Sequence, residues 1–147
     1  LLEPLDGKFD YIIMDCPPSL GMLTVNALCA GNELLVPLQC EYYALEGIAR
    51  LMDTVKIVKQ RLNPSLNIMG VLLTMYDGRN RLAQHVKDDV SAHFSEQVFE
   101  AIIPRNVRLS EAPSYGKPVI TYDIKSKGAE AYLSLAQELV KRNSPDE

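Results

Sequence analysis

The sequence predicts an α/β protein with an open, mostly parallel sheet and helices on both faces. Short apolar runs bounded by turn residues alternate with longer segments in which apolar residues recur every three or four positions. The unbroken runs are typical of strands buried on both faces of a parallel sheet, and the periodic segments of the helices that cover it. The 147 residues suffice for one domain with its own core. We therefore expect 1–142 to form the C-terminal part of a single domain, followed by a polar tail at 143–147.

Three strands and two helices are expected in the first half. The strands are 11–14, 33–38 and 67–74, and Pro37 marks the end of the second. The helix between the first two, 20–30, is expected to stop at Gly31 in a left-handed conformation. The helix 44–62 is expected to stop at Asn63-Pro64. Its apolar stripe consists of Leu45, Ile48, Met52, Val55 and Leu62.

The second half repeats the alternation after a turn at Tyr76-Asp77-Gly78. A four-residue repeat of apolar side chains predicts a helix over 81–94. A strand follows at 98–103, closed by Pro104, and 105–115 forms either a short helix or an ordered loop. A brief strand is expected at 119–122 and a last helix at 126–142. The residues of this helix expected to face inward are Tyr132, Leu135, Ala136, Leu139 and Val140.

Composition excludes several classes of protein. Hydrophobic content of 47% with 23% charged residues is typical of a soluble globular protein. No apolar run is long enough to cross a bilayer and no leader pattern is present, so we expect a cytoplasmic protein without a membrane partner. His85 and His93 are expected in solvent, and no GxSxG or HExxH motif is present. The cysteines lack metal-ligand spacing and are expected to be free, mostly buried thiols; they are Cys16, Cys29 and Cys40.

Charge is unevenly distributed along the chain. The net charge of −4 argues against a protein that coats nucleic acid with its whole surface. Residues 1–60 carry four basic and eight acidic side chains, whereas 61–147 carry eleven of each. Within 101–128, five basic residues face two acidic ones, a local charge of +3. This segment is either a weak basic patch for nucleic acid or ordinary solvated surface.

Asp15 stands at the expected carboxyl end of the first strand, and ligands of open α/β sheets bind at that edge. Its carboxylate could hold a hydrated metal ion on a bound phosphate, or it could simply begin a turn. The stiff loop from Pro17 to Gly21 has amides and a hydroxyl that could sense a γ-phosphate. The phosphate-cradling motif GxxxxGK[ST] is absent from the 147 residues, so we expect this chain to carry only part of a nucleotide site.

Five stretches in order resemble the C-terminal part of the ParA/Soj family of chromosome-partitioning ATPases. They are FDYIIMDCPPSLG, LLVPLQCEYYALEG, GVLLTMYDGR, IIPRNVRLSEAPSYGKP and YDIKSKGAEAYLSLAQEL, spread over 9–139. The related MinD ATPases fit less well, because no basic C-terminal membrane-targeting helix is evident. The resemblance implies a P-loop NTPase fold, ATP and Mg²⁺ as ligands, and a deviant Walker A P-loop with its signature lysine upstream of Leu1. On this basis the chain by itself is expected to be inactive.

The resemblance also implies roles for residues within the matching motifs. Asp15 resembles the Walker B aspartate, which holds magnesium through water, and Pro17, Pro18, Ser19 and Gly21 resemble switch II. The residues that resemble the family's adenine-enclosing loop are Pro104, Arg105, Asn106 and Val107. They are expected next to a strand end with Thr74, Met75 and Asp77. For Thr74 and Met75, packing of a strand end on the core stays an alternative. Candidate DNA contacts are Arg105, Arg108, Lys125 and Lys127, with Lys87 and Arg79 behind them; for Arg105 the nucleotide loop is the alternative role.

The implied function is ATP-dependent partitioning of chromosomes or plasmids in the nucleoid. The ATP-bound form would be a homodimer that binds DNA without sequence preference, and a ParB-like partner would stimulate hydrolysis. Two alternatives stay open on the sequence: a ParA-like protein that positions another cargo, and a catalytically inactive structural fragment.

Overall fold

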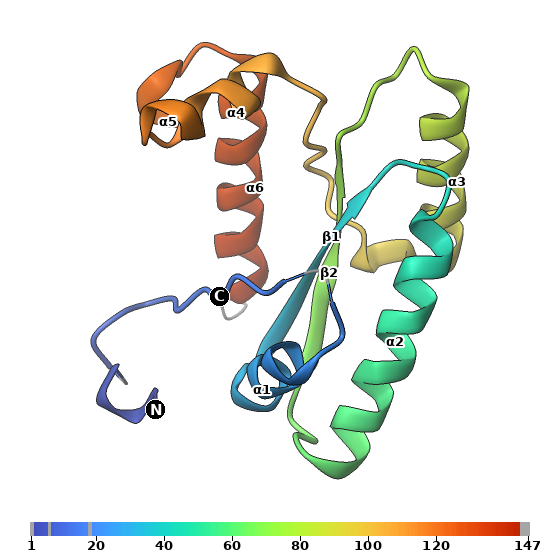
Figure 1. Cartoon of the computed structure of the whole chain (residues 1–147), viewed down its shortest axis with the longest axis vertical. Helices are drawn as coiled ribbons and strands as arrows, with labels where there is room; N and C mark the ends of the chain where they lie inside the picture. The colour runs from blue at the N-terminus through green and yellow to red at the C-terminus, as the bar shows by residue number, and fades with distance from the viewer. Residues whose placement is uncertain (1, 6, 18, 145–147) are drawn as a thin grey trace. The chain divides into compact units, whose positions relative to one another are not determined.

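The computed structural model describes residues 2–5, 7–17 and 19–144 (Figure 1). The chain divides into two compact units: residues 1–34 with 47–68, and residues 35–46 with 69–147. The helices and strands are η1 (Glu3–Leu5), α1 (Met22–Ala30), β1 (Glu33–Gln39), α2 (Ala44–Arg61), β2 (Asn67–Thr74), α3 (Arg81–Phe94), η2 (Ser95–Gln97), α4 (Val107–Glu111), η3 (Ala112–Tyr115), α5 (Val119–Tyr122) and α6 (Lys127–Asn143).

The core of the first unit joins α1 to α2. Its buried side chains are Leu28, Val55, Val58 and Leu66, surrounded by Val25, Leu34, Leu51 and Ile68. Asn63 ends α2 as predicted, and its buried amide donates to the carbonyls of Leu28 and Gly31 at 2.9 and 2.8 Å. Leu28 lies in the last turn of α1 and Gly31 directly follows the helix, where carbonyls lack partners within the helix. The left-handed stop expected at Gly31 is wrong: its φ is −81°, because the chain runs directly into β1.

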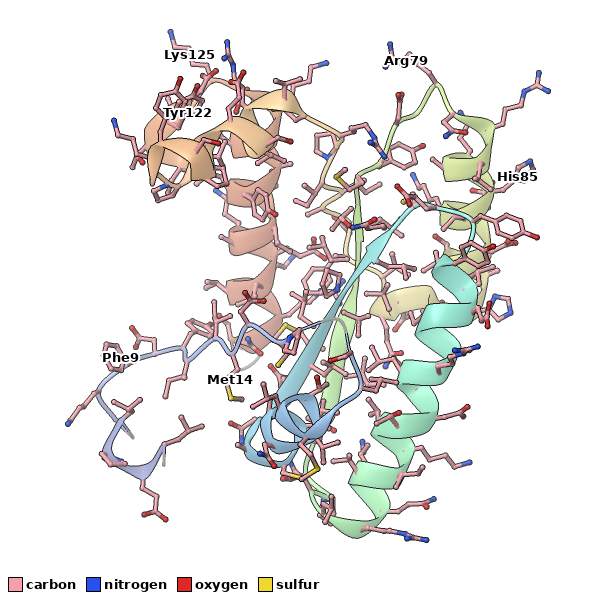
Figure 2. The ribbon with its side chains drawn as sticks, in the orientation of Figure 1. Phe9, Met14, Arg79, His85, Tyr122 and Lys125 are labelled. Carbon is pink, nitrogen blue, oxygen red and sulfur yellow. The ribbon has the colours of Figure 1, made fainter. Side chains whose placement is uncertain are left out.

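The segment Tyr11–Met14 is not the buried strand that its sequence predicts. Its four side chains are between 37% and 86% exposed, and the backbone has no strand assignment. Figure 2 shows Phe9 and Met14 along this extended segment. An apolar run becomes a strand only where a neighbouring strand completes its hydrogen-bond ladder. No strand within the described ranges pairs with it.

The two strands of the sheet are parallel neighbours. Cys40 N donates to Thr74 O at 3.1 Å and Asn67 N to Asn32 O at 2.9 Å, so the residues pair in ascending order along both strands. Pro37 does not end β1 as expected: it is exposed within the strand, between buried Val36 and Leu38. A proline fits there because its position needs no backbone donor.

The strand expected at 98–103 is interrupted. The described residues form two isolated parallel bridges, Val71 with Val98 and Tyr76 with Pro104. The amides of Phe99 and Ile103 still donate to the carbonyls of Val71 and Leu73 in β2, both at 2.9 Å. Between them, the amides of Glu100 and Ala101 donate to the carboxylate of Glu138 at 3.0 and 2.9 Å. A side chain of α6 thus satisfies two consecutive amides at the place where the ladder is interrupted.

Residues 119–122 form the short helix α5 and not the strand that the sequence predicts. The amides of Thr121 and Tyr122 both donate to the carbonyl of Pro118 at 3.0 Å, which closes a helical turn. Within the neighbouring segment 105–115, residues 107–115 form the short helix α4 followed by η3, which ends at Gly116 with a φ of 61°. The predicted helix over 81–94 is confirmed residue for residue as α3.

The inward face of α6 agrees only in part with the prediction. Leu135 packs on the second core as predicted and Leu139 is half-buried, but Tyr132, Ala136 and Val140 are exposed, and Ala131 packs on the core in their place. That core consists of Leu72, Phe99 and Ile103, with Leu35, Met69 and Leu109 also around it. Glu138 and Arg142 share the face of Ala131 and Leu135 by helical spacing, and their contacts with 69 and 98–101 fix that face inward.

Of the predictions for burial of single side chains, some are confirmed and others are wrong. In α2, Ile48 and Val55 are buried as expected, but Leu62 is exposed and Val58 takes its place. Cys40 is buried, whereas the expected burial of Cys16 and Cys29 is wrong because their segments lie at the surface. His85 and His93 are exposed as predicted. Among the helices that the structure describes, none has the length and apolarity to cross a bilayer.

Candidate functional site

The carboxyl ends of β1 and β2 define one edge of the sheet, where the predicted adenine-loop residues gather. Thr74 ends β2, and Tyr76 after it pairs with the stretch around Pro104. Tyr76 N donates to Ile103 O at 3.1 Å, and Arg105 N donates to Tyr76 O at 2.9 Å. The structure therefore brings together the two stretches, 74–77 and 104–107, that lie about 30 residues apart in sequence. This edge is where ligands bind in open α/β sheets.

Met75 adopts a backbone conformation that disfavours ordinary side chains. Its φ is 53°, and Ser95 is the other described non-glycine residue with a positive φ. Such a residue costs about 1 kcal/mol or more and is held by its surroundings. Here the hydrogen bonds of Thr74 and Tyr76 on either side impose it. No glycine or asparagine signals this turn in the sequence, so pattern reasoning missed it.

Asp77 is fully engaged by its neighbour Arg79. One carboxylate oxygen accepts from Arg79 N and Nε at 3.1 and 3.0 Å, and the other accepts from its terminal guanidinium nitrogen at 2.9 Å. These hydrogen bonds lower the pKa of Asp77 from 3.8 to about 2. Figure 2 shows Arg79 at the tip of the loop before α3, and its side chain is 91% exposed. Asp77 thus stays ionised and shapes this loop.

The residues after Pro104 have structural partners of their own. The Arg105 guanidinium donates to Glu41 Oε1 at 3.2 Å, which links the loop after β1 to the 104–107 loop. Asn106 caps α4 by accepting from Arg108 N at 2.9 Å. Val107 is 70% exposed. Glu41 was missed in the sequence because nothing there indicates which of the acidic residues lies opposite Arg105.

The predicted switch segment leads into α1. Asp15, Pro17, Ser19 and Gly21 are all exposed, and Pro18 lies outside the described residues. The buried Thr24 hydroxyl donates to Ser19 O at 2.6 Å, and Val25 N donates to Gly21 O at 3.1 Å. These two hydrogen bonds anchor the loop at 19–21 to the first turn of α1. Asp15 takes part in neither of them.

A single carboxylate suits magnesium better than it suits most other metals. No cluster of three or more His, Cys, Asp or Glu that could hold a metal occurs in the described part of the chain. Magnesium keeps several waters and binds through one or two carboxylates together with phosphate oxygens. An exposed Asp15 fits that mode, in which most ligands come from water and nucleotide.

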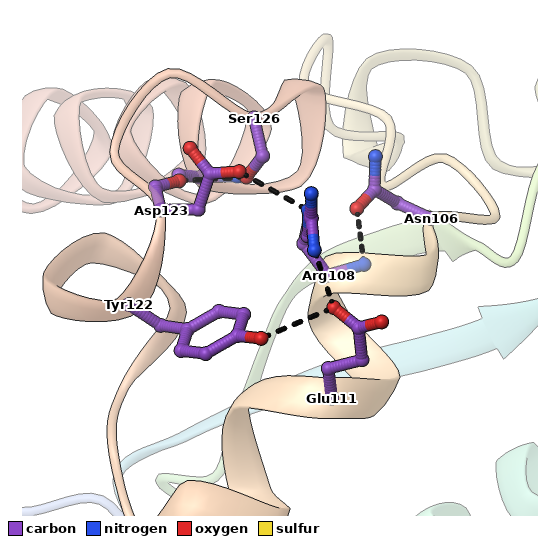
Figure 3. Close-up of polar contacts among 7 residues, drawn as sticks. Asn106, Arg108, Glu111, Tyr122, Asp123 and Ser126 are labelled. Carbon is purple, nitrogen blue, oxygen red and sulfur yellow. Dashed lines mark hydrogen bonds and ion pairs between the residues drawn. The ribbon is translucent and has the colours of Figure 1, made fainter.

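Arg108 is held in a polar network that joins α4 to α5 and the start of α6 (Figure 3). Its guanidinium contacts Glu111 at 2.8 Å and Asp123 at 3.2 Å. The Tyr122 hydroxyl donates to the same Glu111 carboxylate at 3.2 Å. The hydrogen bond from Arg108 lowers the pKa of Glu111, and the same bond raises the pKa of Arg108. Two carboxylates therefore offset the charge of Arg108.

The lysines of the predicted basic patch differ in how freely they face solvent. Lys125 and Lys127 are exposed, and within the described residues neither has an ion pair or side-chain hydrogen bond. Figure 2 shows Lys125 projecting from the turn between α5 and α6. Lys87 is half-buried, with its ammonium 5.8 Å from the centre of the Tyr76 ring. Burial raises the pKa of the nearby Cys40 thiol, and Lys87 partly opposes that shift.

Several known proteins are similar to this chain in sequence. A sequence model described as an AAA domain matches residues 1–68. The chromosome partitioning protein ParA of Myxococcus xanthus is 60% identical over 144 residues, which are 98% of this chain and 51% of that protein. The chromosome-partitioning ATPase Soj of Treponema pallidum is 52% identical over 143 residues, or 97% of this chain and 56% of that protein.

Among solved structures, cobyrinic acid a,c-diamide synthase from Mycobacterium smegmatis, with a bound ATP analog and magnesium, matches with a TM-score of 0.76 and 39% identity. The match covers 95% of this chain and 50% of that one. It confirms the predicted α/β class with a parallel sheet and helices. In sequence the chain is similar to these chromosome-partitioning proteins, and it spans about half the length of the curated relatives it matches.

Proposed function

We propose that this chain forms part of a ParA/Soj-type ATPase that partitions chromosomes or plasmids. The observation that carries the proposal is the 60% identity to a partitioning ParA over 98% of the chain. The pairing of 74–77 with 103–105 at the ligand edge of the sheet supports it independently. The phosphate cradle and its lysine belong to a segment upstream of Leu1 in this proposal.

Asp15 and the adenine loop have distinct tasks in the proposed site. Asp15 holds the hydrated magnesium, which when bound neutralises charge on the β- and γ-phosphates. Pro17, Pro18, Ser19 and Gly21 form the switch that responds to the γ-phosphate. The loop Pro104–Val107, with Thr74, Met75 and Asp77 beside it, encloses the adenine. These residues position the nucleotide and exclude water from its surroundings. Phosphoryl transfer needs little covalent chemistry from the protein itself.

The proposed ATP-bound state is a homodimer that binds DNA without sequence preference, and a ParB-like protein stimulates its hydrolysis. Exposed lysines suit phosphate contacts, which need positive charge and no base recognition. Lys125 and Lys127 supply unpaired charge, and Arg108 and Lys87 contribute from more restrained positions.

ATP hydrolysis by the complete protein tests the enzymatic part. We expect Asp15→Ala to abolish magnesium-dependent turnover, whereas the control Asp10→Ala, exposed in the same segment, leaves turnover unchanged. The 147-residue chain alone is expected to hydrolyse no ATP. Undiminished turnover in the Asp15 variant, or appreciable turnover by the chain alone, would contradict the assignment.

DNA binding is tested by its salt dependence. Each lost phosphate contact lowers the slope of log K against log salt by about 0.9. We expect that decrease for Lys125→Ala and for Lys127→Ala in the ATP-bound protein. Lys141→Ala, at the other end of α6, is the matched control and should keep the slope. If the slopes of Lys125→Ala and Lys127→Ala equal the wild-type slope, as expected for Lys141→Ala, these lysines do not contact DNA phosphates.

A further inference from the structure

We propose that Glu41 is a positioning residue for the adenine loop, acting through Arg105. The inference rests on the proposed function, since it assigns a role within the same nucleotide site. Glu41 follows β1, and Arg105 lies in the loop predicted to enclose the base. The two residues lie 64 positions apart in sequence, and the sheet edge brings them together.

Arg105 is the residue at which the adenine loop is fixed from two sides. Its backbone amide donates to Tyr76 O at 2.9 Å, which ties the loop to the end of β2. Its guanidinium donates to Glu41 Oε1 at 3.2 Å, which ties the same loop to the end of β1. Removing either tie leaves one anchor on a segment that carries four proposed nucleotide contacts.

Glu41 is itself restrained by its backbone. Its amide donates to Gln39 O at 2.8 Å, and its carbonyl accepts from Ala44 N at 3.0 Å at the start of α2. The carboxylate therefore projects from a closed turn between a strand and a helix. Because the backbone of Glu41 is already fixed, only side-chain freedom is lost when the pair forms.

The alternative role for this pair is general stability of the fold. Both side chains are more than half exposed, 55% for Arg105 and 58% for Glu41. Exposed ion pairs contribute little to global stability. A measurable effect of Glu41 on nucleotide binding, with unchanged unfolding, thus indicates orientation of the loop and not support of the core.

The test measures ATP hydrolysis by the complete protein that contains this chain. For Glu41→Gln we expect KM for ATP to rise about 1.5- to 5-fold, the range of an exposed charge pair, while kcat stays unchanged. Raising the salt concentration should bring the wild-type KM toward that of the variant. Glu96→Gln, exposed in η2 and without a described side-chain partner, is the matched control and should match wild type.

A double-mutant cycle shows whether Glu41 acts through Arg105. In an Arg105→Ala background, Glu41→Gln should change KM no further, because its partner is already absent. An undiminished effect in that background, or an unchanged KM for Glu41→Gln alone, overturns the inference and leaves the proposed function standing. A wild-type protein that hydrolyses no ATP overturns both.

Discussion

Replacing Glu138 should destabilise the second unit, because its carboxylate holds backbone and side-chain donors together. The carboxylate accepts four hydrogen bonds: from Glu100 N, from Ala101 N, and from two nitrogens of Arg142 at 3.1 and 2.7 Å. Arg142 in turn donates to the carbonyls of Met69 and Val98 and lies over the Phe99 ring at 4.1 Å.

The magnitude follows from the groups left without partners. Glu138→Ala leaves two backbone donors and a guanidinium without their acceptor, and each unsatisfied group costs about 1–3 kcal/mol when buried. The side chains of Glu138 and Arg142 are 16% and 25% exposed, so water can recover part of this. We expect a loss of about 2–4 kcal/mol in the free energy of unfolding. Gln137→Ala, one residue earlier on an exposed position, should lose less than about 0.5 kcal/mol.

Urea unfolding at pH 7, followed by circular dichroism, measures the difference. Amide hydrogen exchange at Ala101 supplies a local readout, since its protection should fall in the Glu138 variant and not in the control. Equal unfolding free energies for the two variants would refute the reasoning. So would unchanged exchange at Ala101, because the amide would then have a partner other than the carboxylate.

The pH dependence of this contact follows from the pKa of Glu138. Burial raises that pKa, but the hydrogen bonds from Ala101, Glu100 and Arg142 outweigh burial and lower it below its usual 4.5. A carboxyl group with a lowered folded pKa stabilises the protein above the unfolded value. The contribution of Glu138 is therefore complete above about pH 5 and is lost as the pH falls through the lowered folded value.

Three further changes test other contacts. Asn63→Ala should destabilise the first unit by about 1–3 kcal/mol, because two carbonyls lose their donor; Asn26→Ala, exposed in α1, is the control for urea unfolding. Gly70→Ala should lower the melting temperature, because its Cβ would meet the Gln97 carbonyl and, at 2.8 Å, Phe99; no change would mean that β2 can shift. Arg79→Ala should raise the pKa of Asp77 from about 2 toward 3.8 in a carbon-detected NMR titration, and an unmoved pKa would exclude this hydrogen bonding as its cause.

The exposed segment Tyr11–Met14 predicts the behaviour of the isolated 147-residue chain. An extended apolar stretch with unpaired backbone groups favours association with other chains. We expect sedimentation velocity to show species larger than a monomer, and a charged substitution at Ile13, 86% exposed, to reduce them. A well-behaved monomer at high concentration would contradict this expectation.

The parts of the fold that the sequence predicted well depend on local patterns. The helix over 81–94 has a regular apolar repeat, a capping Asn80 and no competing signal, and its bounds are correct. β2 is likewise correct from 67 to 74, because turn residues bound an unbroken apolar run. In both elements the information that sets the structure lies within the element itself.

The failed predictions depend on partners that the apolar pattern of the segment does not reveal. The apolar residues at 11–14 read as a strand, but a strand also needs a neighbour for its ladder, which the local pattern does not encode. At 119–122, the carbonyl of Pro118 closes a helical turn where β-branched residues favour a strand. The face of α6 is set by Glu138 and Arg142, two polar residues that a hydrophobic periodicity leaves out.

The candidate site was predictable as a set of positions and less so as a set of contacts. Motif resemblance placed 74–77 and 104–107 together, and the backbone hydrogen bonds agree. The partners of Arg105 and Arg108 were not predictable, because any of several acidic residues could have faced them. The roles of these residues in nucleotide and DNA binding stay predictions.

The interrupted stretch at 98–103 also protects the molecule from its neighbours. An unbroken strand at the margin of a sheet offers its amides to strands of other molecules, which can then extend the sheet into an aggregate. Here the Glu138 carboxylate already accepts from the amides of Glu100 and Ala101, so a foreign strand would first have to displace it. Protonation of this carboxylate in acid would weaken both hydrogen bonds and make that displacement easier.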